Sequence, residues 1–167
     1  MTPAELMVDA FGRVVESGTA VVDGLTEEQL AARPAPDANS IVWLVWHLAR
    51  VQDDHVADVA GREPVWTAQG YAERFDLPFD EGATGYGQDA EAVGRVRASA
   101  ELLAAYLRAV HEQTVAFLDT VTAEDLDRVV DEDWDPPVTL GARLVSVLDD
   151  DTQHVGQAAY VRGLLGA

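Results

Sequence analysis

Two segments of the sequence place a histidine within an apolar pattern where it could bind a metal ion. His47 stands between large apolar residues in Trp43-Leu44-Val45-Trp46-His47-Leu48. His154 interrupts a series of apolar residues at alternating steps of four and three, which is the spacing of a buried helical seam. Asp150 precedes His154 by four residues, so the two side chains lie about 6 Å apart on one helix face. An inward His on one helix and an Asp-x-x-x-His on another therefore suit one divalent ion.

Three consecutive aspartates, Asp149, Asp150 and Asp151, occupy the middle of this second segment, where aspartate is unfavourable in a helix. At about 100° per residue from His154, Asp150 lies at about −40°, Asp151 at about +60° and Asp149 at about −140°. The apolar face centres at about +30°, so Asp149 points to water while Asp150 and Asp151 flank the seam. A buried, unpaired carboxylate costs several kcal/mol, so an arginine, a neutral histidine or a metal must compensate it.

Each of these residues also has an interpretation without a metal. A single inward histidine is more often a hydrogen-bonded core residue, and an aspartate run is more often a solvated helix surface. His47 and His55 share a helix face, but they lie about 12 Å apart along the axis and cannot bind the same ion. His111 has no partner pattern and is expected at the surface, and the tryptophans are expected in the core or in a cleft wall.

Amphipathic helices must position these side chains. Asn39 or Ser40 can cap the helix that carries His47, and Thr139 can cap the helix that carries His154. Short turns are predicted to begin at Thr26 and Thr122. The apolar spacing predicts four long helices, over residues 3–22, 41–60, about 89–120 and about 140–165.

Residues 61–88 lie between the second and third predicted helices and are rich in glycine and aromatic residues. A segment of this length is unusual without a function, so we expect it to cross over the bundle and to line a substrate cleft. The sequence thus predicts an all-α fold, a four-helix bundle with one long crossover, in a single domain over residues 1–167.

The composition limits the partners and the ligand chemistry. The formal charge is −19, with 30 acidic residues against 11 basic ones that are all arginine, so no nucleic-acid partner is expected. The sequence has no cysteine, so a metal must bind through His, Asp or Glu. There is no run of about 18 apolar residues and no signal-peptide pattern, so we expect a cytoplasmic protein with no membrane partner. The absence of lysine and the many Ala, Val, Gly and Asp residues indicate a GC-rich bacterial genome.

Two motifs resemble those of the DinB-like proteins. The run from His154 to Gly163, HVGQAAYVRG, resembles the family's His-x-Gly-Gln-x-x-x-x-Arg signature. The run from Asn39 to Leu48, NSIVWLVWHL, resembles the family's second helix with its Trp-x-x-x-His-Leu pattern. The resemblance covers essentially the whole chain and is nearest to a branch grouped with mycothiol-dependent enzymes such as maleylpyruvate isomerase.

The resemblance implies a four-helix bundle with one divalent metal, held by a histidine of the second helix and by two residues four apart in the fourth. Carried over, these ligands are His47, Asp150 and His154. Aspartate replaces the glutamate often found in that branch and is one methylene shorter, so Asp151 stays an alternative to Asp150. Zinc is the expected ion, with nickel, manganese and iron as alternatives.

Two histidines and one carboxylate leave coordination positions open, as catalytic zinc sites do. A bound cation lowers the pKa of a coordinated thiol, and a chain without cysteine must take that thiol from a small molecule. We therefore expect a transferase that activates a low-molecular-weight thiol, mycothiol by resemblance, for transfer to a small electrophilic substrate.

Other residues are assigned supporting roles at this site. Gln157 is expected to orient a metal ligand by hydrogen bonding, and Asp54 and His55 are candidate acid–base groups or substrate contacts. The alternatives are a metal-dependent hydrolase with water in place of the thiol, an iron site for oxygen chemistry, and a non-enzymatic metal-binding or stress-related protein. The chain is expected to be a monomer or a homodimer.

Overall fold

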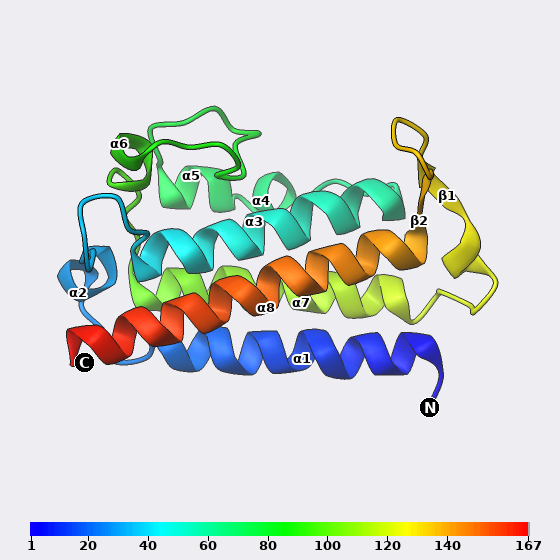
Figure 1. Ribbon diagram of the computed structural model, residues 1–167, viewed down its shortest axis with the longest axis horizontal. Helices are drawn as coiled ribbons and strands as arrows, with labels where there is room; N and C mark the ends of the chain where they lie inside the picture. Colours follow the sequence, from blue (N-terminus) through cyan, green and yellow to red (C-terminus); the bar gives the residue numbers. More distant parts are fainter. Residues whose placement is uncertain (167) are drawn as a thin grey trace.

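The computed structural model describes residues 1–166 and consists mainly of four long helices, as the sequence predicts (Figure 1). Helices α1 and α8 run in one direction, and helices α3 and α7 run in the opposite one. Helix α3 packs along α8 and α7, and α1 packs along the other sides of α7 and α8, which closes the bundle. The long helices are α1 (Pro3–Val22), α3 (Ile41–Ala60), α7 (Ala100–Leu118) and α8 (Leu140–Leu165).

The helices that carry the candidate ligands begin and end at residues that cap them. The Ser40 hydroxyl accepts a hydrogen bond from the Trp43 amide at the start of α3, and Gly61 ends that helix in the left-handed conformation. Thr139 caps α8 in the same way as Ser40 caps α3. Thr26 caps the short helix α2 (Glu27–Ala31) in a capping box with Gln29. These predicted helix starts are therefore confirmed.

The prediction of one helix over about 89–120 is wrong, because two caps divide the segment. Asp89 caps the short helix α6 (Ala90–Val93), and a second cap at Ser99 starts α7 at Ala100. The crossover over residues 61–88 is also less irregular than expected. It contains the short helices α4 (Val65–Ala68) and α5 (Tyr71–Phe75), which Figure 1 shows above α3.

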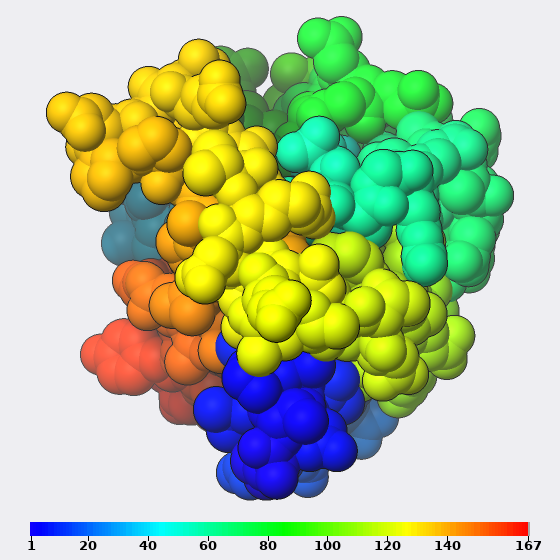
Figure 2. All heavy atoms as spheres, turned by 90° about the vertical axis from the view of Figure 1, so that its right-hand side faces the viewer, coloured from blue at the N-terminus to red at the C-terminus, as the bar shows by residue number. Residues whose placement is uncertain are grey.

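A small hairpin precedes α8 and was not predicted from the sequence. It follows the 3-10 turn η1 (Asp125–Asp127) and pairs β1 (Val129–Asp131) with β2 (Val138–Thr139) in antiparallel fashion. Figure 2 shows the hairpin, in yellow and orange, projecting from one end of the molecule. Within residues 1–166, no helix is long and apolar enough to cross a membrane.

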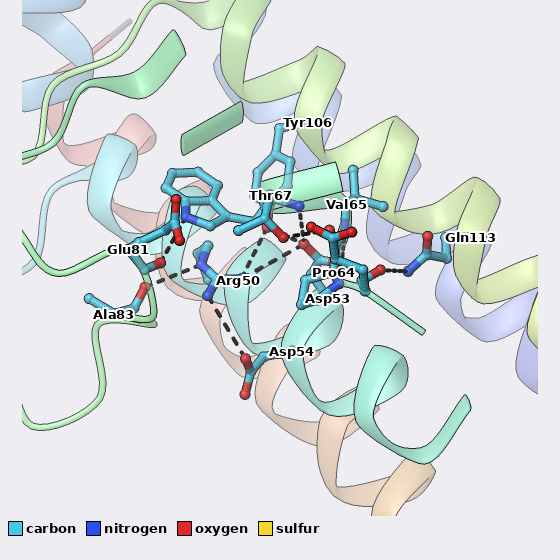
Figure 3. A network of polar contacts seen from close by, with 12 residues as sticks. Arg50, Asp53, Asp54, Pro64, Val65, Thr67, Glu81, Ala83, Tyr106 and Gln113 are labelled. Carbon is cyan, nitrogen blue, oxygen red and sulfur yellow. Dashed lines mark hydrogen bonds and ion pairs between the residues drawn. The ribbon is translucent and has the colours of Figure 1, made fainter. Parts of the chain in front are cut away.

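A buried polar network attaches the crossover to α3 and α7 (Figure 3). The two carboxylate oxygens of Asp53 accept hydrogen bonds from the Val65 and Trp66 amides, each at 2.8 Å. The Tyr106 hydroxyl of α7 donates to the same carboxylate at 2.8 Å. Arg50, one helical turn before Asp53, lies 3.7 Å from it and is 1 % exposed.

The network offsets the cost of burying its charges. Burial raises the pKa of Asp53, while the donors from Tyr106 and the two backbone amides favour its charged form. The guanidinium of Arg50 lies 5.0 Å from the centre of the Trp66 ring and donates from Nε to the Ala83 carbonyl at 3.2 Å. The network thus fixes both ends of the crossover, at α4 and at Ala83.

Replacement of Tyr106 by phenylalanine removes a donor from the buried Asp53 carboxylate and the hydroxyl that accepts a 3.5 Å hydrogen bond from Arg50 Nη1. We expect Y106F to lower the free energy of unfolding by about 1–3 kcal/mol, measured by urea denaturation. The matched control is Y71F, because Tyr71 packs against the Tyr106 ring at 4.9 Å and has no hydrogen bond from its hydroxyl within residues 1–166. Equal effects of the two substitutions would contradict the role assigned to the network.

Candidate metal centre

Three of the predicted ligands lie together between α3 and α8. One ligand atom each from His47, Asp150 and His154 forms a group in which all atoms lie within 4.8 Å of one another. The His154 Nε2 atom is 3.4 Å from Asp150 Oδ1, and the ring centres of His47 and His154 are 4.8 Å apart. His47 is 5 % exposed, whereas Asp150 and His154 are half-buried, so the group lies at the edge of the core and is open on one side.

Both histidines are oriented by a hydrogen bond on Nδ1. The His47 Nδ1 atom lies 2.6 Å from the Thr84 carbonyl oxygen, and the His154 Nδ1 atom lies 2.9 Å from Gln157 Oε1. Both partners are acceptors, so each Nδ1 carries a proton. His47 Nε2 then keeps its lone pair, whereas His154 Nε2 lies 3.4 Å from Asp150 Oδ1 and must release its proton to bind a metal. This is the arrangement in which a histidine binds a metal through Nε2 while its second nitrogen is held by an acceptor.

The crossover forms one wall of the site. The Trp43 ring stacks on His47 with centres 4.5 Å apart and an interplanar angle of 18°. Its indole Nε1 donates to Gln88 Oε1 at 2.8 Å. Gly85 has a φ of 95°, and a β-carbon there would lie only 2.7 Å from His47 Nδ1. The crossover backbone therefore approaches the imidazole as closely as glycine permits.

The protonation states around the group follow from burial and from mutual contact. Burial lowers the pKa of His47. The hydrogen bond with Asp150 raises the pKa of His154. Burial alone would raise the pKa of Asp150, but the hydrogen bond with His154 and the nearby histidine charges hold it below its ordinary value. An ionised carboxylate and a neutral histidine are the forms that bind metal ions.

The donor set fits one divalent cation. Two nitrogens and one carboxylate oxygen are a ligand set typical of open, three-ligand zinc sites. Two ligands about 2.1 Å from a tetrahedral ion lie about 3.4 Å apart, which matches the 3.4 Å between His154 and Asp150. The second oxygen of Asp150 is buried and has no hydrogen-bond partner within residues 1–166, as expected of an atom that faces a cation.

Asp151, the alternative ligand, lies elsewhere. Its side chain is 0 % exposed, and neither carboxylate oxygen has a hydrogen-bond partner in the described part of the chain. Burial, together with the charge of Asp150, raises the pKa of Asp151 well above its ordinary value. The angular estimate correctly placed Asp151 near the centre of the seam, but that position directs it into the core and outside the group of three.

The remaining candidate residues are not part of the ligand group. Asp54 is half exposed and lies 3.9 Å from Arg50. His55 contacts Arg143 of α8, with 2.8 Å between Nδ1 and Nη1. Gln157 is exposed and contacts His154 from the solvent side. The expectation that His111 lies at the surface is wrong, because its ring is half-buried and its Nδ1 is fully enclosed beside α1.

The sequence interpretation missed the residues of the crossover that hold His47. Thr84 acts through its carbonyl group and Gly85 through its lack of a side chain, so neither has a side-chain signal of its own. The run Thr84-Gly85-Tyr86-Gly87 within an aromatic segment was the available indication of a close backbone approach.

Comparisons with known proteins identify the family to which this fold belongs. Residues 11–158 match the sequence profile of the DinB superfamily. The chain is similar to a crystal structure described as that of a conserved protein from Enterococcus faecalis, with a TM-score of 0.92 and 33 % sequence identity. That similarity covers 99 % of this chain and 98 % of the other. No curated protein matches the chain.

Loss of metal on substitution tests the ligand set. After loading with zinc and removal of excess ion, we expect about one zinc per chain in the wild type and in D151L, and little in H47A, D150A and H154A. Elemental analysis measures this. D151L is also expected to raise the free energy of unfolding by about 1–3 kcal/mol, because it removes a buried carboxylate without partners. Full metal content in the histidine variants would refute the site, and loss in D151L alone would transfer the carboxylate role to Asp151.

A second prediction concerns the contact between Gly85 and His47. G85A is expected to weaken zinc affinity at least tenfold, because the added methyl group displaces the imidazole. The control is G87A, since Gly87 also has a positive φ, of 72°, but has no atom within 4 Å of the added carbon. Competition with a chromophoric chelator measures both affinities. Equal affinities in the two variants would mean that the crossover does not position His47.

Proposed function

Because the chain belongs to the DinB superfamily, we propose that it is a metal-dependent transferase that activates a small thiol for transfer to an electrophilic substrate. The observation that carries the proposal is the group formed by His47, Asp150 and His154, which offers three ligand atoms and in which Asp150 and His154 are partly exposed. Zinc is the ion we propose, since two nitrogens and one oxygen are common zinc donors. Nickel, manganese and iron are the alternatives that elemental analysis distinguishes.

The source of the thiol follows from composition. The sequence contains no cysteine, so the sulfur nucleophile of such a reaction must come from a small molecule. The choice of a mycothiol-type thiol is supported by the resemblance of the segments around His47 and His154 to the mycothiol-dependent branch of the family. When bound, the metal would supply positive charge that lowers the pKa of the thiol.

The residues of the chain prepare this site before the reactants arrive. Thr84 and Gln157 fix the two histidines with their Nε2 atoms directed away from these acceptors. Trp43 covers one face of His47 and excludes water from it. Both reactants would reach the group where Asp150 and His154 are exposed to solvent. The thiol proton is released to solvent, the sulfur forms a bond to the electrophilic carbon, and the leaving group departs with its electron pair.

Dependence of activity on thiol tests the function. With zinc-loaded protein and monochlorobimane as the electrophile, we expect conjugation to mycothiol at least a hundredfold faster than without protein, and loss of this enhancement in H154A. Fluorescence of the conjugate measures the rate. Turnover of an ester substrate without thiol would instead support the hydrolase alternative. Purified protein with no stoichiometric metal and no activity would support the non-enzymatic one.

A further inference from the structure

A second polar cluster lies at the same interface between α3 and α8, about two helical turns from the metal ligands. Arg143 of α8 lies between His55 of α3 and Asp131 of the hairpin. Its Nη1 atom is 2.8 Å from His55 Nδ1, and its Nη2 atom is 2.8 Å from Asp131 Oδ2. Burial and Arg143 lower the pKa of His55, and the charge of Asp150 partly opposes this shift, so the cluster and the metal ligands are near each other.

The contact with Arg143 determines where the proton of His55 resides. A guanidinium group can donate hydrogen bonds but cannot accept them, so His55 Nδ1 must be the acceptor. A neutral imidazole that accepts at Nδ1 carries its proton on Nε2. Protonation of Nδ1 would replace this hydrogen bond with a repulsion between two cations. Accordingly, burial and the charge of Arg143 lower the pKa of His55.

The other ring nitrogen is free to contact a ligand. Within residues 1–166, His55 Nε2 has no hydrogen-bond partner, and it is not among the polar atoms that are buried without one. It therefore reaches solvent as an N–H donor. Asp131 holds Arg143 in place from the hairpin, so the geometry of this donor depends on three elements of the fold.

The charges around this donor select the kind of acceptor. Arg143 is the positive group in contact with His55, and its charge is balanced by Asp131. Carboxylates face His55 or its guanidinium partner from α3 and β1: Asp54, Asp58 and Asp131. Asp150 of α8 also acts on His55, but a bound zinc would offset its charge. A further anion at Nε2 would be repelled by this surplus of negative charge, whereas an uncharged oxygen would not.

We propose that His55, held by Arg143 and Asp131 as the neutral Nε2–H tautomer, donates a hydrogen bond to an uncharged carbonyl-type oxygen of the electrophilic substrate. The identity of the ligand rests on the proposed function, whereas the tautomer of His55 does not depend on that function. Of the two roles that the sequence left open for His55, acid–base group or substrate contact, this is the second: a donor that selects neutral electrophiles.

The tautomer is tested by long-range proton–nitrogen NMR on the histidine rings at pH 7. The wild type is expected to show His55 protonated on Nε2 only, assigned by the loss of its signals in H55Q. R143M should release the ring to a tautomer mixture, with a higher pKa, whereas R128M should not. Arg128 is the matched control because it donates to the Val59 carbonyl nearby without touching His55. A wild-type ring protonated on Nδ1, or on both nitrogens, would overturn the proposal.

The role toward substrate is tested with a matched pair of electrophiles, iodoacetamide and iodoacetate, and mycothiol as the thiol. In each reaction the sulfur bonds to the methylene carbon, iodide leaves with the bonding pair, and the thiol proton passes to solvent. The zinc-loaded wild type is expected to accelerate the amide reaction more than the acid reaction. H55L should raise KM for iodoacetamide about fivefold. H55Q retains an N–H donor near the position of Nε2, so its KM should stay close to the wild-type value.

The outcomes separate this inference from the proposed function. Equal KM values for H55L and H55Q, or a preference for iodoacetate, would refute the substrate role of His55 while leaving the thiol transfer intact. An absence of catalysis by the wild type with both electrophiles and with monochlorobimane would refute the proposed function together with that role. The NMR spectra would still decide the tautomer.

Discussion

The buried pair of Arg50 and Asp53 is the interaction on which the candidate site depends. Asp53 fixes the start of α4 by accepting two backbone hydrogen bonds, and Arg50 fixes the other end of the crossover at the Ala83 carbonyl. The next residue, Thr84, supplies the carbonyl that orients His47. A buried charge pair is costly unless its hydrogen bonds are satisfied, and here those bonds also position a metal ligand. The same network therefore holds the crossover against the bundle and keeps the Thr84 carbonyl in position to orient His47.

The interface between α3 and α8 contains charged residues of a kind that the core of a helix bundle usually excludes. The pKa of His47 is lowered and that of Asp150 is also held down, so both favour the states that bind a cation. The pKa of His154 is raised by Asp150, so a metal ion would take the place of the proton between them. Asp151, one residue further along α8, shows the alternative, a carboxyl that is fully buried and whose pKa is raised by that burial. The difference between these neighbours is one of direction around the helix, by about 100°.

The sequence predicted what helical periodicity and capping determine. The bounds of α3 and α8 and the all-α bundle were predicted because Ser40 and Thr139 carry local cap signals. The closeness of Asp150 and His154 was also predicted, because residues four apart lie on the same face of a helix. The contacts of Thr84, Gly85 and Arg143 could not be predicted, because they join segments far apart in the sequence. Thr84 and Gly85 also act through their backbone, and Arg143 acts by determining the tautomer of His55. The break before α7 was missed because Asp89 and Ser99 are equally good caps.

The most direct test of this account is the position of the metal itself. Crystals of the zinc-loaded protein, measured at the zinc absorption edge, should show one anomalous peak per chain, bound by the Nε2 atoms of His47 and His154 and by the carboxylate of Asp150. Coordination through Nδ1 of either histidine, through Asp151, or at a place away from these three residues would contradict it.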